Sequence, residues 1–456
     1  MLDINTVPLL IETTKGKKYN DIVALCINHD IRNDYLFGYY AGNMFSEVTY
    51  IAVPYNSNSD KTSDYRKLFS NCFHARKTEN GYAIYHNEKL IKATAPDVVY
   101  VMDTMITLAI AQLIIPKIKE GKKLIILEDG GNYCSITNNL EEIFPELKGN
   151  VIGSIEQTTS GTAIAIKSKK NYPQISVARS KVKMNLESIF IGQAIISEIS
   201  ACLRFINEVL SYKKIIIIGY GIVGRSLRVP LNGYRCNIDV LDIDEKIRNV
   251  AIKDGFKAYS SLTESNFEKD TIMIGCTGKQ SFTEEMLLSF INGKANKLFL
   301  FGASSKNFDF KYFIDLIDDK NSKFRINKTK TYTYADEYKI EYKGIEKNIL
   351  LFGNGLPINL LRASEVPVID GVMDSVFTEM ADGAKLLVDK HDILDNKLYL
   401  LGSSDFILGR EYEIGIIKKW FNINNLYFNE DADNLLGSHP ETDYLRNKLI
   451  SEQSNK

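Results

Sequence analysis

The chain has 456 residues, which is enough for about two to four domains of ordinary size. Apolar residues make up 45% of the chain and charged residues 25%, a balance typical of globular proteins. The 56 Lys and Arg residues and the 57 Asp and Glu residues leave a formal net charge of -1, so nothing in the charge favours nucleic acid as a partner.

Four short apolar runs in the first part of the chain predict buried strands: Val23–Ile27, Val48–Val53, Val98–Met102 and Leu124–Leu127. Each run is too short for a helix, and several are rich in β-branched residues. Between the last two runs, Thr104–Lys119 has apolar residues at helical spacing and predicts a crossover helix. Strands joined by such helices form a parallel sheet that is covered on both faces.

A second series of strands and helices begins near the middle of the chain. Leu186–Leu210 is long, mostly apolar and helical in pattern, and the predicted strands follow it: Ile215–Ile218, Asn237–Leu241, Thr271–Ile274 and Lys297–Phe301. Their spacing leaves room for intervening helices. The sequence therefore predicts an α/β fold with two domains.

The sequence predicts neither disulfides, nor a metal site, nor a membrane span. The six cysteines are scattered without a CxxC pair, which is typical of reduced thiols in a cytoplasmic protein. The five histidines show no HxxxH or HExxH spacing, so no metal site is predicted. No apolar run reaches the roughly 18 residues of a membrane span, and the first residues do not resemble a signal peptide, so no membrane partner is expected.

A glycine-rich turn follows the four isoleucines directly. Gly219, Gly221 and Gly224 form the pattern GxGxxG between a predicted strand and a predicted helix. The first glycine permits the tight turn, the second lets a pyrophosphate approach the backbone, and the third lets the helix pack closely on the strand. The helix start then offers the amides of Ile222 and Val223 to the phosphates.

Asp242 ends the next predicted strand, 23 residues after Gly219. An acidic side chain at this place accepts hydrogen bonds from the adenosine ribose and repels a 2′-phosphate, so NAD is favoured over NADP. Arg225 could weaken that preference. The alternative is a plain glycine-rich turn with an incidental aspartate that caps a helix.

Several segments beyond this turn resemble those of S-adenosylhomocysteine hydrolases, in the same order from about residue 120 to 380. They are Leu127–Gly131 (LEDGG), Ile155–Gly161 (IEQTTSG), Pro173–Lys183 (PQISVARSKVK), Ile215–Leu227, Cys276–Gly278 (CTG) and Gly353–Leu360 (GNGLPINL). The resemblance implies a Rossmann-type NAD-binding domain inserted into a second α/β domain that holds the substrate. It divides the chain into 1–185 and 351–390 for the substrate domain, 186–350 for the NAD domain and 391–456 for a C-terminal extension.

The resemblance also implies a chemistry and a set of residues. Family members bind NAD and a nucleoside-like substrate as homo-oligomers. They oxidise the 3′-hydroxyl, eliminate a 5′-thiol, add water and reduce the ketone again. The catalytic residues implied here are Asp129, Lys181 and, one position displaced, His29. The residues implied beside the cofactor are Thr277, Gly278 and Asn359, and those implied beside the substrate are Gln157, Thr158, Thr159 and Asn185.

Several positions depart from the family pattern, including a later histidine with no counterpart in Ala363–Pro367 and a C-terminal lysine–tyrosine end that is not recognisable in Tyr427–Lys456. Gln157 and Asn185 stand where the family has carboxylates, and Ala303 stands where it has a histidine. Amides cannot act as bases, so ordinary hydrolysis is not favoured. The sequence therefore favours NAD-dependent oxidation or reduction of a hydroxyl on a nucleoside or related molecule. The alternatives are a noncatalytic relative that binds NAD and a true hydrolase with an unusual residue set.

Some of these single residues also have purely structural explanations. Asp129 could be a turn aspartate, Lys181 a surface lysine and Asp374 a helix cap.

Overall fold

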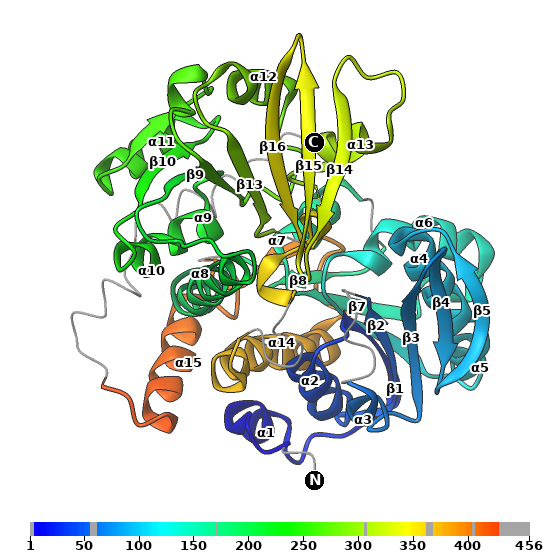
Figure 1. Ribbon diagram of the computed structural model, residues 1–456. Helices are drawn as coiled ribbons and strands as arrows, with labels where there is room; N and C mark the ends of the chain where they lie inside the picture. Colours follow the sequence, from blue (N-terminus) through cyan, green and yellow to red (C-terminus); the bar gives the residue numbers. More distant parts are fainter. Residues whose placement is uncertain are drawn as a thin grey trace. The chain divides into compact units, whose positions relative to one another are not determined.

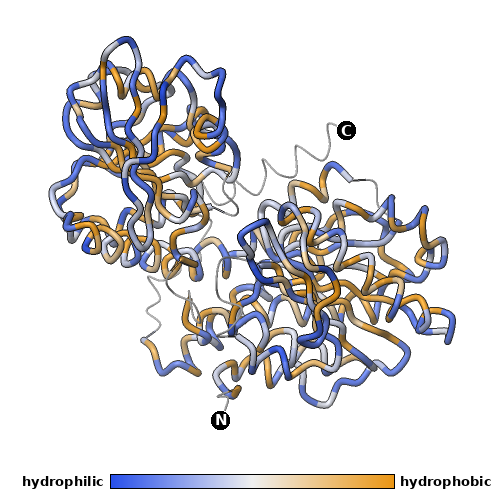
Figure 2. The backbone as a smooth tube through the Cα atoms, turned by 45° about the vertical axis from the view of Figure 1, so that its right-hand side comes forward, coloured by the Kyte–Doolittle hydropathy of each residue, from blue (hydrophilic) through white to orange (hydrophobic). Residues whose placement is uncertain are grey.

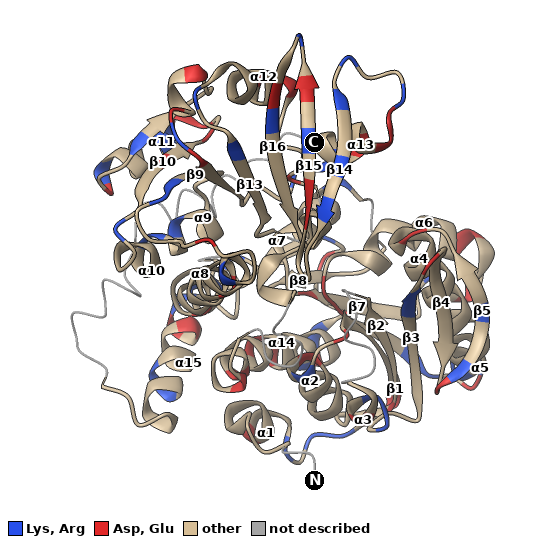
Figure 3. Ribbon diagram, in the orientation of Figure 1, with Lys and Arg blue, Asp and Glu red and all other residues tan. Residues whose placement is uncertain are grey.

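The computed structural model describes residues 4–54, 62–168, 171–304, 308–361, 368–403 and 406–427 (Figure 1). The chain divides into two compact units, one made of Met1–Glu187 with Ser364–Lys456 and the other of Ser188–Ala363. In both units the apolar residues follow the strands and the inner helices, and the polar residues lie on the outer turns (Figure 2). Basic and acidic residues are interspersed along the ribbon of both units (Figure 3).

The first unit is built on a sheet whose order is β17-β8-β7-β6-β1-β2-β3-β4-β5 in the described residues. The strands are β1 Tyr19–His29, β2 Phe45–Val53, β3 Asn71–Thr78, β4 Gly81–His86, β5 Lys89–Ala95, β6 Lys123–Glu128, β7 Val151–Glu156, β8 Gln174–Ser176 and β17 Leu398–Leu400. All neighbours are parallel except β3 with β4 and β4 with β5. The chain order reverses between β1 and β6, and open α/β sheets bind ligands at that point.

Helices cover this sheet, and the apolar core lies between the layers. They are α1 Pro8–Thr14, α2 Arg32–Gly42, α3 Ser63–Arg66, α4 Val98–Ala109, η2 Ile110–Ile114, α5 Ile115–Lys119, α6 Asn132–Ile143, η3 Pro145–Leu147, α7 Thr159–Lys167, η4 Val182–Glu187, α14 Asp370–Lys390 and α15 Arg410–Ile423. The long helix α14 packs on β7 and on α1. Its Asp374 accepts the amides of Leu9 and Leu10 at 2.8 Å each, so this carboxylate caps α1.

The second unit has the sheet order β11-β10-β9-β12-β13-β16-β15-β14 in the described residues. Its strands are β9 Lys214–Ile218, β10 Asn237–Leu241, β11 Lys257–Tyr259, β12 Thr271–Gly275, β13 Lys297–Gly302, β14 Arg325–Thr331, β15 Ala335–Tyr342 and β16 Ile345–Phe352. The first six in this order are parallel and follow the doubly wound order of Rossmann domains, with the switch between β9 and β12. β15 and β14 extend the sheet in antiparallel fashion.

The helical segments of the second unit connect these strands. They are α8 Ser188–Phe205, α9 Ile222–Ser226, α10 Arg228–Asn232, α11 Glu245–Lys253, η5 Glu264–Asn266, α12 Glu284–Asn292, α13 Lys311–Asp318, η6 Gly353–Gly355 and η7 Ile358–Leu360. The core joins aliphatic strand residues to aromatic ones such as Phe267, Phe290 and Phe313, which are fully buried. A continuous apolar core of this size accounts for much of the stability of the unit.

The predicted α/β class is confirmed, and one predicted strand is wrong. Val98–Met102 is the first part of α4. The carboxylate of Asp97 accepts the amide of Tyr100 at 2.9 Å and caps the helix, which overrides the β propensity of the valines. The other predicted runs lie in strands of the structure.

The unit boundaries differ from the expected ones at the C-terminal side. β16 pairs with β13, so the second unit continues to Ala363 rather than ending at residue 350. β17 adds a strand beside β8, and α15 packs on α14. The described part of the expected C-terminal extension therefore belongs to the first unit, while residues 428–456 lie outside the described part.

Two helical segments, Val98–Lys119 and Val182–Phe205, are long and apolar enough to cross a membrane by length and composition alone. In the structure α4 packs on β2 and β3 of its own sheet, and α8 packs on α9, α10 and η7. Protein side chains thus cover part of each helix, as expected for helices that flank a sheet.

Candidate functional site

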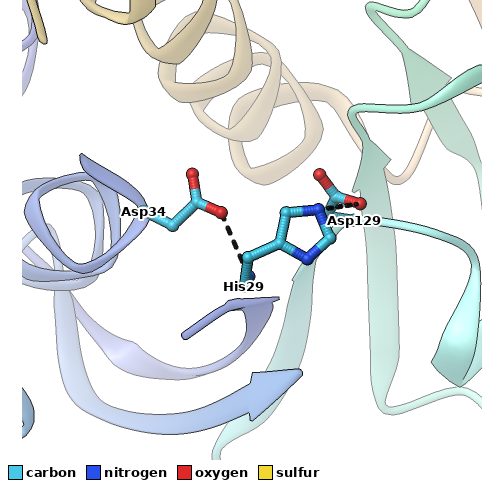
Figure 4. Close-up of side chains that lie close together, drawn as sticks. All are labelled: His29, Asp34 and Asp129. Carbon is cyan, nitrogen blue, oxygen red and sulfur yellow. Dashed lines mark hydrogen bonds and ion pairs between the residues drawn. The ribbon is translucent and has the colours of Figure 1, made fainter. Parts of the chain in front are cut away.

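Three polar side chains meet at the switch point of the first sheet. His29 ends β1, Asp129 follows β6 directly, and Asp34 lies in the first turn of α2. The Nε2 of His29 lies 3.3 Å from Oδ1 of Asp129, and Oδ2 of Asp34 accepts the backbone amide of His29 at 3.0 Å (Figure 4). The imidazole therefore stands between two carboxylates that come from different elements.

The sheet itself holds this arrangement. β1 and β6 are adjacent and parallel, and the amide of Asp129 donates to the carbonyl of Ile27 at 2.8 Å. The two functional side chains leave the sheet at the ends of neighbouring strands, where the connections run to opposite faces. The side chain of Asp129 is 4% exposed and that of His29 is 16% exposed.

Burial dominates the electrostatics of this cluster. It lowers the pKa of His29, while the charge of Asp129 opposes that shift and Lys183 adds to it. Burial and the neighbouring Asp129 raise the pKa of Asp34 well above its ordinary value. The cluster thus favours a neutral imidazole and resists two ionised carboxylates side by side.

Glu156 shapes the turn after Asp129. This buried side chain at the end of β7 accepts the amides of Gly130 at 3.1 Å, Gly131 at 2.9 Å and Thr158 at 2.6 Å. Burial, together with Glu128 and Asp129, raises its pKa well above the ordinary value. Glu156 was not among the residues selected from the sequence, although an acid at a strand end beside a Gly-Gly turn is a recognisable signal.

The residues expected beside the substrate are placed as follows. Gln157 is buried. Its backbone amide donates to the carbonyl of Glu128 at 3.1 Å, which places the residue next to Asp129. Thr158 caps α7 by accepting the amide of Gly161, and Thr159 is exposed at the start of that helix.

The segment that carries Lys181 is anchored from the C-terminal part of the chain. The amide of Lys181 donates to Glu413 in α15 at 2.8 Å, and the hydroxyl of Ser180 donates to Glu379 in α14 at 2.6 Å. Lys181 is 2% exposed, so it is not a surface lysine. Asn185 is partly buried in η4.

Lys183 lies two residues after Lys181 and was not among the residues that the sequence predicted for the site. Its Nζ pairs with Glu187 at 2.7 Å. Its charge lowers the pKa of His29 and opposes the rise in the pKa of Asp34. Lys183 is therefore the lysine whose charge is felt at the His29 cluster.

The glycine turn of the second unit has room where a phosphate would lie. Gly219 has a positive φ of +86°, which favours glycine. A Cβ on Gly224 would lie 2.0 Å from the carbonyl oxygen of Gly219, so that glycine is needed for packing. A Cβ on Gly221 would meet no described atom within 4 Å, and Ile222 and Val223 follow as the first residues of α9.

Asp242 lies beside this turn. Its Oδ2 accepts the amide of Tyr220 at 2.8 Å, and its Oδ1 accepts the amide of Asp244 at 2.9 Å. A carboxylate offers about four lone-pair positions, so two remain for ribose hydroxyls. The open glycine and the oriented carboxylate fit the adenosine diphosphate part of NAD.

A second aspartate holds the basic residues that follow the turn. Asp254 accepts from Arg225 at 3.1 Å, from Arg228 at 2.5 Å and from the hydroxyl of Tyr220 at 2.9 Å. Arg225 is thus engaged by a carboxylate within the unit. This pairing opposes the recruitment of a 2′-phosphate and agrees with the preference for NAD that Asp242 indicates.

The other residues expected beside the cofactor also lie in the second unit. Asp309 accepts the amide of Thr277 at 3.0 Å and its hydroxyl at 2.7 Å, which fixes the loop that ends in Gly278. Asn359 is buried in η7, after the sixth strand of the Rossmann order. Asp309 could not be found from the sequence because its partners are distant along the chain.

These observations define the class: an α/β protein of two units, one of which carries a Rossmann-type dinucleotide site of the NAD type. No model of a known protein family matches the chain. The adenosylhomocysteinase of Archaeoglobus fulgidus is 26% identical over 282 residues, which cover 61% of this chain and 64% of that protein. The S-inosyl-L-homocysteine hydrolase of Methanocaldococcus jannaschii is 26% identical over 289 residues, covering 62% and 64%.

The resemblance found in the sequence is confirmed, since the chain is similar to adenosylhomocysteinases and to an S-inosyl-L-homocysteine hydrolase over 60–62% of its length. It spans slightly less than two thirds of the length of these relatives. A solved structure of a dipicolinate synthase from Bacillus halodurans is 12% identical, with a TM-score of 0.36, and covers 66% of this chain and 87% of that one.

Proposed function

We propose that the chain binds NAD and uses it to oxidise or reduce a hydroxyl of a nucleoside or a related small molecule. The carboxylate of Asp242, fixed beside the glycine turn by the amide of Tyr220, is the observation that carries this proposal. When bound, NAD supplies a hydride acceptor and donor. The turn amides bind its phosphates, and Asp242 binds its ribose.

The first unit supplies groups for proton transfer. Oxidation of a hydroxyl releases a proton, so a base must lie within reach of that hydroxyl. We assign Lys181 to the hydroxyl and Asp129 to the adjacent carbon. His29, in contact with Asp129, completes the pair that accepts and returns protons. The assignment rests on the family resemblance and on the low exposure of Asp129 and Lys181.

A noncatalytic role is the second candidate. Gln157, Asn185 and Ala303 replace groups that transfer protons in the family, and each such group is worth roughly 10² to 10⁴-fold in rate. A chain that lacks them can still bind NAD and a nucleoside. True hydrolysis of S-adenosylhomocysteine is the third and weakest candidate for the same reason.

One experiment separates the three. A sample of the purified protein is denatured to measure released NAD, and intact protein is mixed with adenosine, S-adenosylhomocysteine and a nucleoside panel. NADH absorbance without thiol release supports oxidation of a hydroxyl, and release of homocysteine supports hydrolysis. Bound NAD that no compound reduces supports the noncatalytic role. Absence of NAD binding contradicts all three.

Lys181→Ala tests the assigned base. We expect the variant to bind NAD normally and to form no NADH with a compound that reduces the cofactor in the parent protein. Unchanged NADH formation would remove Lys181 from its role. Assembly as a homo-oligomer and a cytoplasmic location stay predictions.

A further inference from the structure

The cluster at the switch point of the first sheet has the composition of a cation site. One ligand atom each from His29, Asp34 and Asp129 lie within 4.8 Å of one another. His29 ends β1, Asp129 directly follows the neighbouring strand β6, and Asp34 lies in α2. We propose that His29, Asp34 and Asp129 bind one divalent transition-metal ion. Binding of the ion is argued from the geometry of the cluster, and only the action of the ion on a substrate rests on the proposed function.

The distances bracket one ion. Imidazole nitrogen and carboxylate oxygen bind such ions at about 2.1 Å, so two ligand atoms lie at most about 4.2 Å apart. The widest possible separation in the cluster exceeds that by a few tenths of an ångström, which side-chain rotation can close. The pair of His29 Nε2 and Asp129 Oδ1, 3.3 Å apart, already has the separation of adjacent ligands.

Charge also points to a cation. Asp34 is 1% exposed and Asp129 is 3% exposed, and two carboxylates buried this closely repel each other. A divalent ion with two carboxylates and a neutral imidazole has no net charge, which removes that repulsion. Lys183 is a cation whose charge acts on both His29 and Asp34, but its Nζ is paired with Glu187 at 2.7 Å.

A candidate for a fourth ligand follows the neighbouring strand. Gln157 comes directly after β7, its backbone amide donates to the carbonyl of Glu128 just before Asp129, and the residue is 5% exposed. Its Oε1 has no hydrogen-bond partner within the part of the chain that the structure describes. An amide oxygen buried without a donor is costly, and coordination of a cation relieves that cost.

The ligand set selects the class of ion. Imidazole favours zinc and other first-row transition metals over magnesium and calcium, and carboxylates bind all of them. Bound here, the ion would polarise a substrate hydroxyl or carbonyl oxygen. With the ion bound, His29 and Asp129 would be ligands rather than proton-transfer groups, and this polarisation would take the place of their proton transfer and of part of the set that Gln157, Asn185 and Ala303 lack. Histidine spacing in the sequence did not predict the site because its ligands come from separate elements.

Cobalt titration of protein freed of metal by chelation tests the proposal. We expect one Co²⁺ per chain, with visible ligand-field bands that Zn²⁺ abolishes. His29→Gln and Asp34→Asn should each weaken Co²⁺ binding by about 10–100-fold or more. The matched control is His391→Gln, because His391 of the same unit also pairs with an acid, Asp392 at 3.1 Å, and should leave the affinity unchanged.

The outcomes are separable. Absence of Co²⁺ bands in the parent protein overturns the site, and so does an equal loss in His391→Gln and His29→Gln. If Asp34→Asn fails to fold, X-ray absorption of the parent protein loaded with Zn²⁺ tests the ligand set instead. A zinc coordination shell without an imidazole contradicts the assignment of His29. NAD titration of the same samples reports on the second unit, so failure of the metal site and failure of the proposed function are distinguishable.

Discussion

Two glycines of the dinucleotide turn give opposite predictions for the same substitution. Gly221→Ala places a methyl group where no described atom lies within 4 Å, on a backbone whose φ of -73° suits alanine. Gly224→Ala places it 2.0 Å from the carbonyl oxygen of Gly219. The first change therefore affects only a ligand, and the second affects the fold.

The magnitudes follow from these contacts. Gly221→Ala at a compatible backbone should leave the free energy of unfolding unchanged or raise it by about 0.4–1 kcal/mol. It should also cost NAD the charge-assisted hydrogen bonds of its phosphates, each about 1.5–3 kcal/mol, so affinity should fall about 10–100-fold per bond lost. Gly224→Ala should cost about 1–3 kcal/mol of stability through overpacking.

Chemical denaturation and NAD titration of both variants measure the two effects side by side. The reasoning is refuted if Gly221→Ala binds NAD like the parent protein, or if it loses more stability than Gly224→Ala. The first result would mean that the open space at Gly221 does not receive a phosphate, and the second would mean that the contacts at the two glycines do not decide their stability.

Three further changes test other parts of the structure. Asp242→Asn keeps the shape but removes the charge, so NAD should bind about tenfold more weakly and the discrimination against NADP should shrink in paired titrations. Glu156→Gln leaves one oxygen for three amides and should cost about 1–3 kcal/mol in chemical denaturation while NAD binding persists. Burial raises the pKa of Asp374 to about 7, above its value of about 3.9 in the unfolded chain, so the folded protein favours the protonated form. The stabilisation from this group is therefore complete below about pH 4 and is lost as the pH rises to about 7. Asp374→Asn should flatten that loss, by at most about 4 kcal/mol, and parallel pH profiles of the two proteins would contradict the assignment.

Local chemistry explains which elements the sequence predicted. Runs such as Ile215–Ile218 are apolar on both faces because helices cover both sides of a parallel sheet, and they are recognisable without tertiary information. Strand β5, Lys89–Ala95, is mostly exposed and carries no such signal. Val98–Met102 has strand-like residues, but the cap from Asp97 makes it helical. Propensity failed where one side-chain hydrogen bond decided the outcome.

The candidate sites divide in the same way. The glycine turn is contiguous, so its residues could be found together. Asp254, which accepts from Tyr220 and Arg225, and Asp309, which fixes the loop at Thr277, are carboxylates whose donors lie far away in the chain, and single-sequence patterns do not join them. Asp34 lies five residues after His29, and it meets His29 because the short turn between β1 and α2 brings its carboxylate back to the backbone amide of His29.

Comparison of Gly221 with Gly224 indicates whether the glycine turn of the second unit serves to bind a ligand or only to allow the fold. Gly224 is required by its own backbone neighbours, so its presence says nothing about a ligand. Gly221 has no described neighbour that excludes alanine, and glycine there costs about 0.4–1 kcal/mol of stability through the unfolded chain. A residue that lowers stability and helps no packing has a physical use only if something approaches the backbone. The dinucleotide site is therefore better explained by a ligand than by the fold.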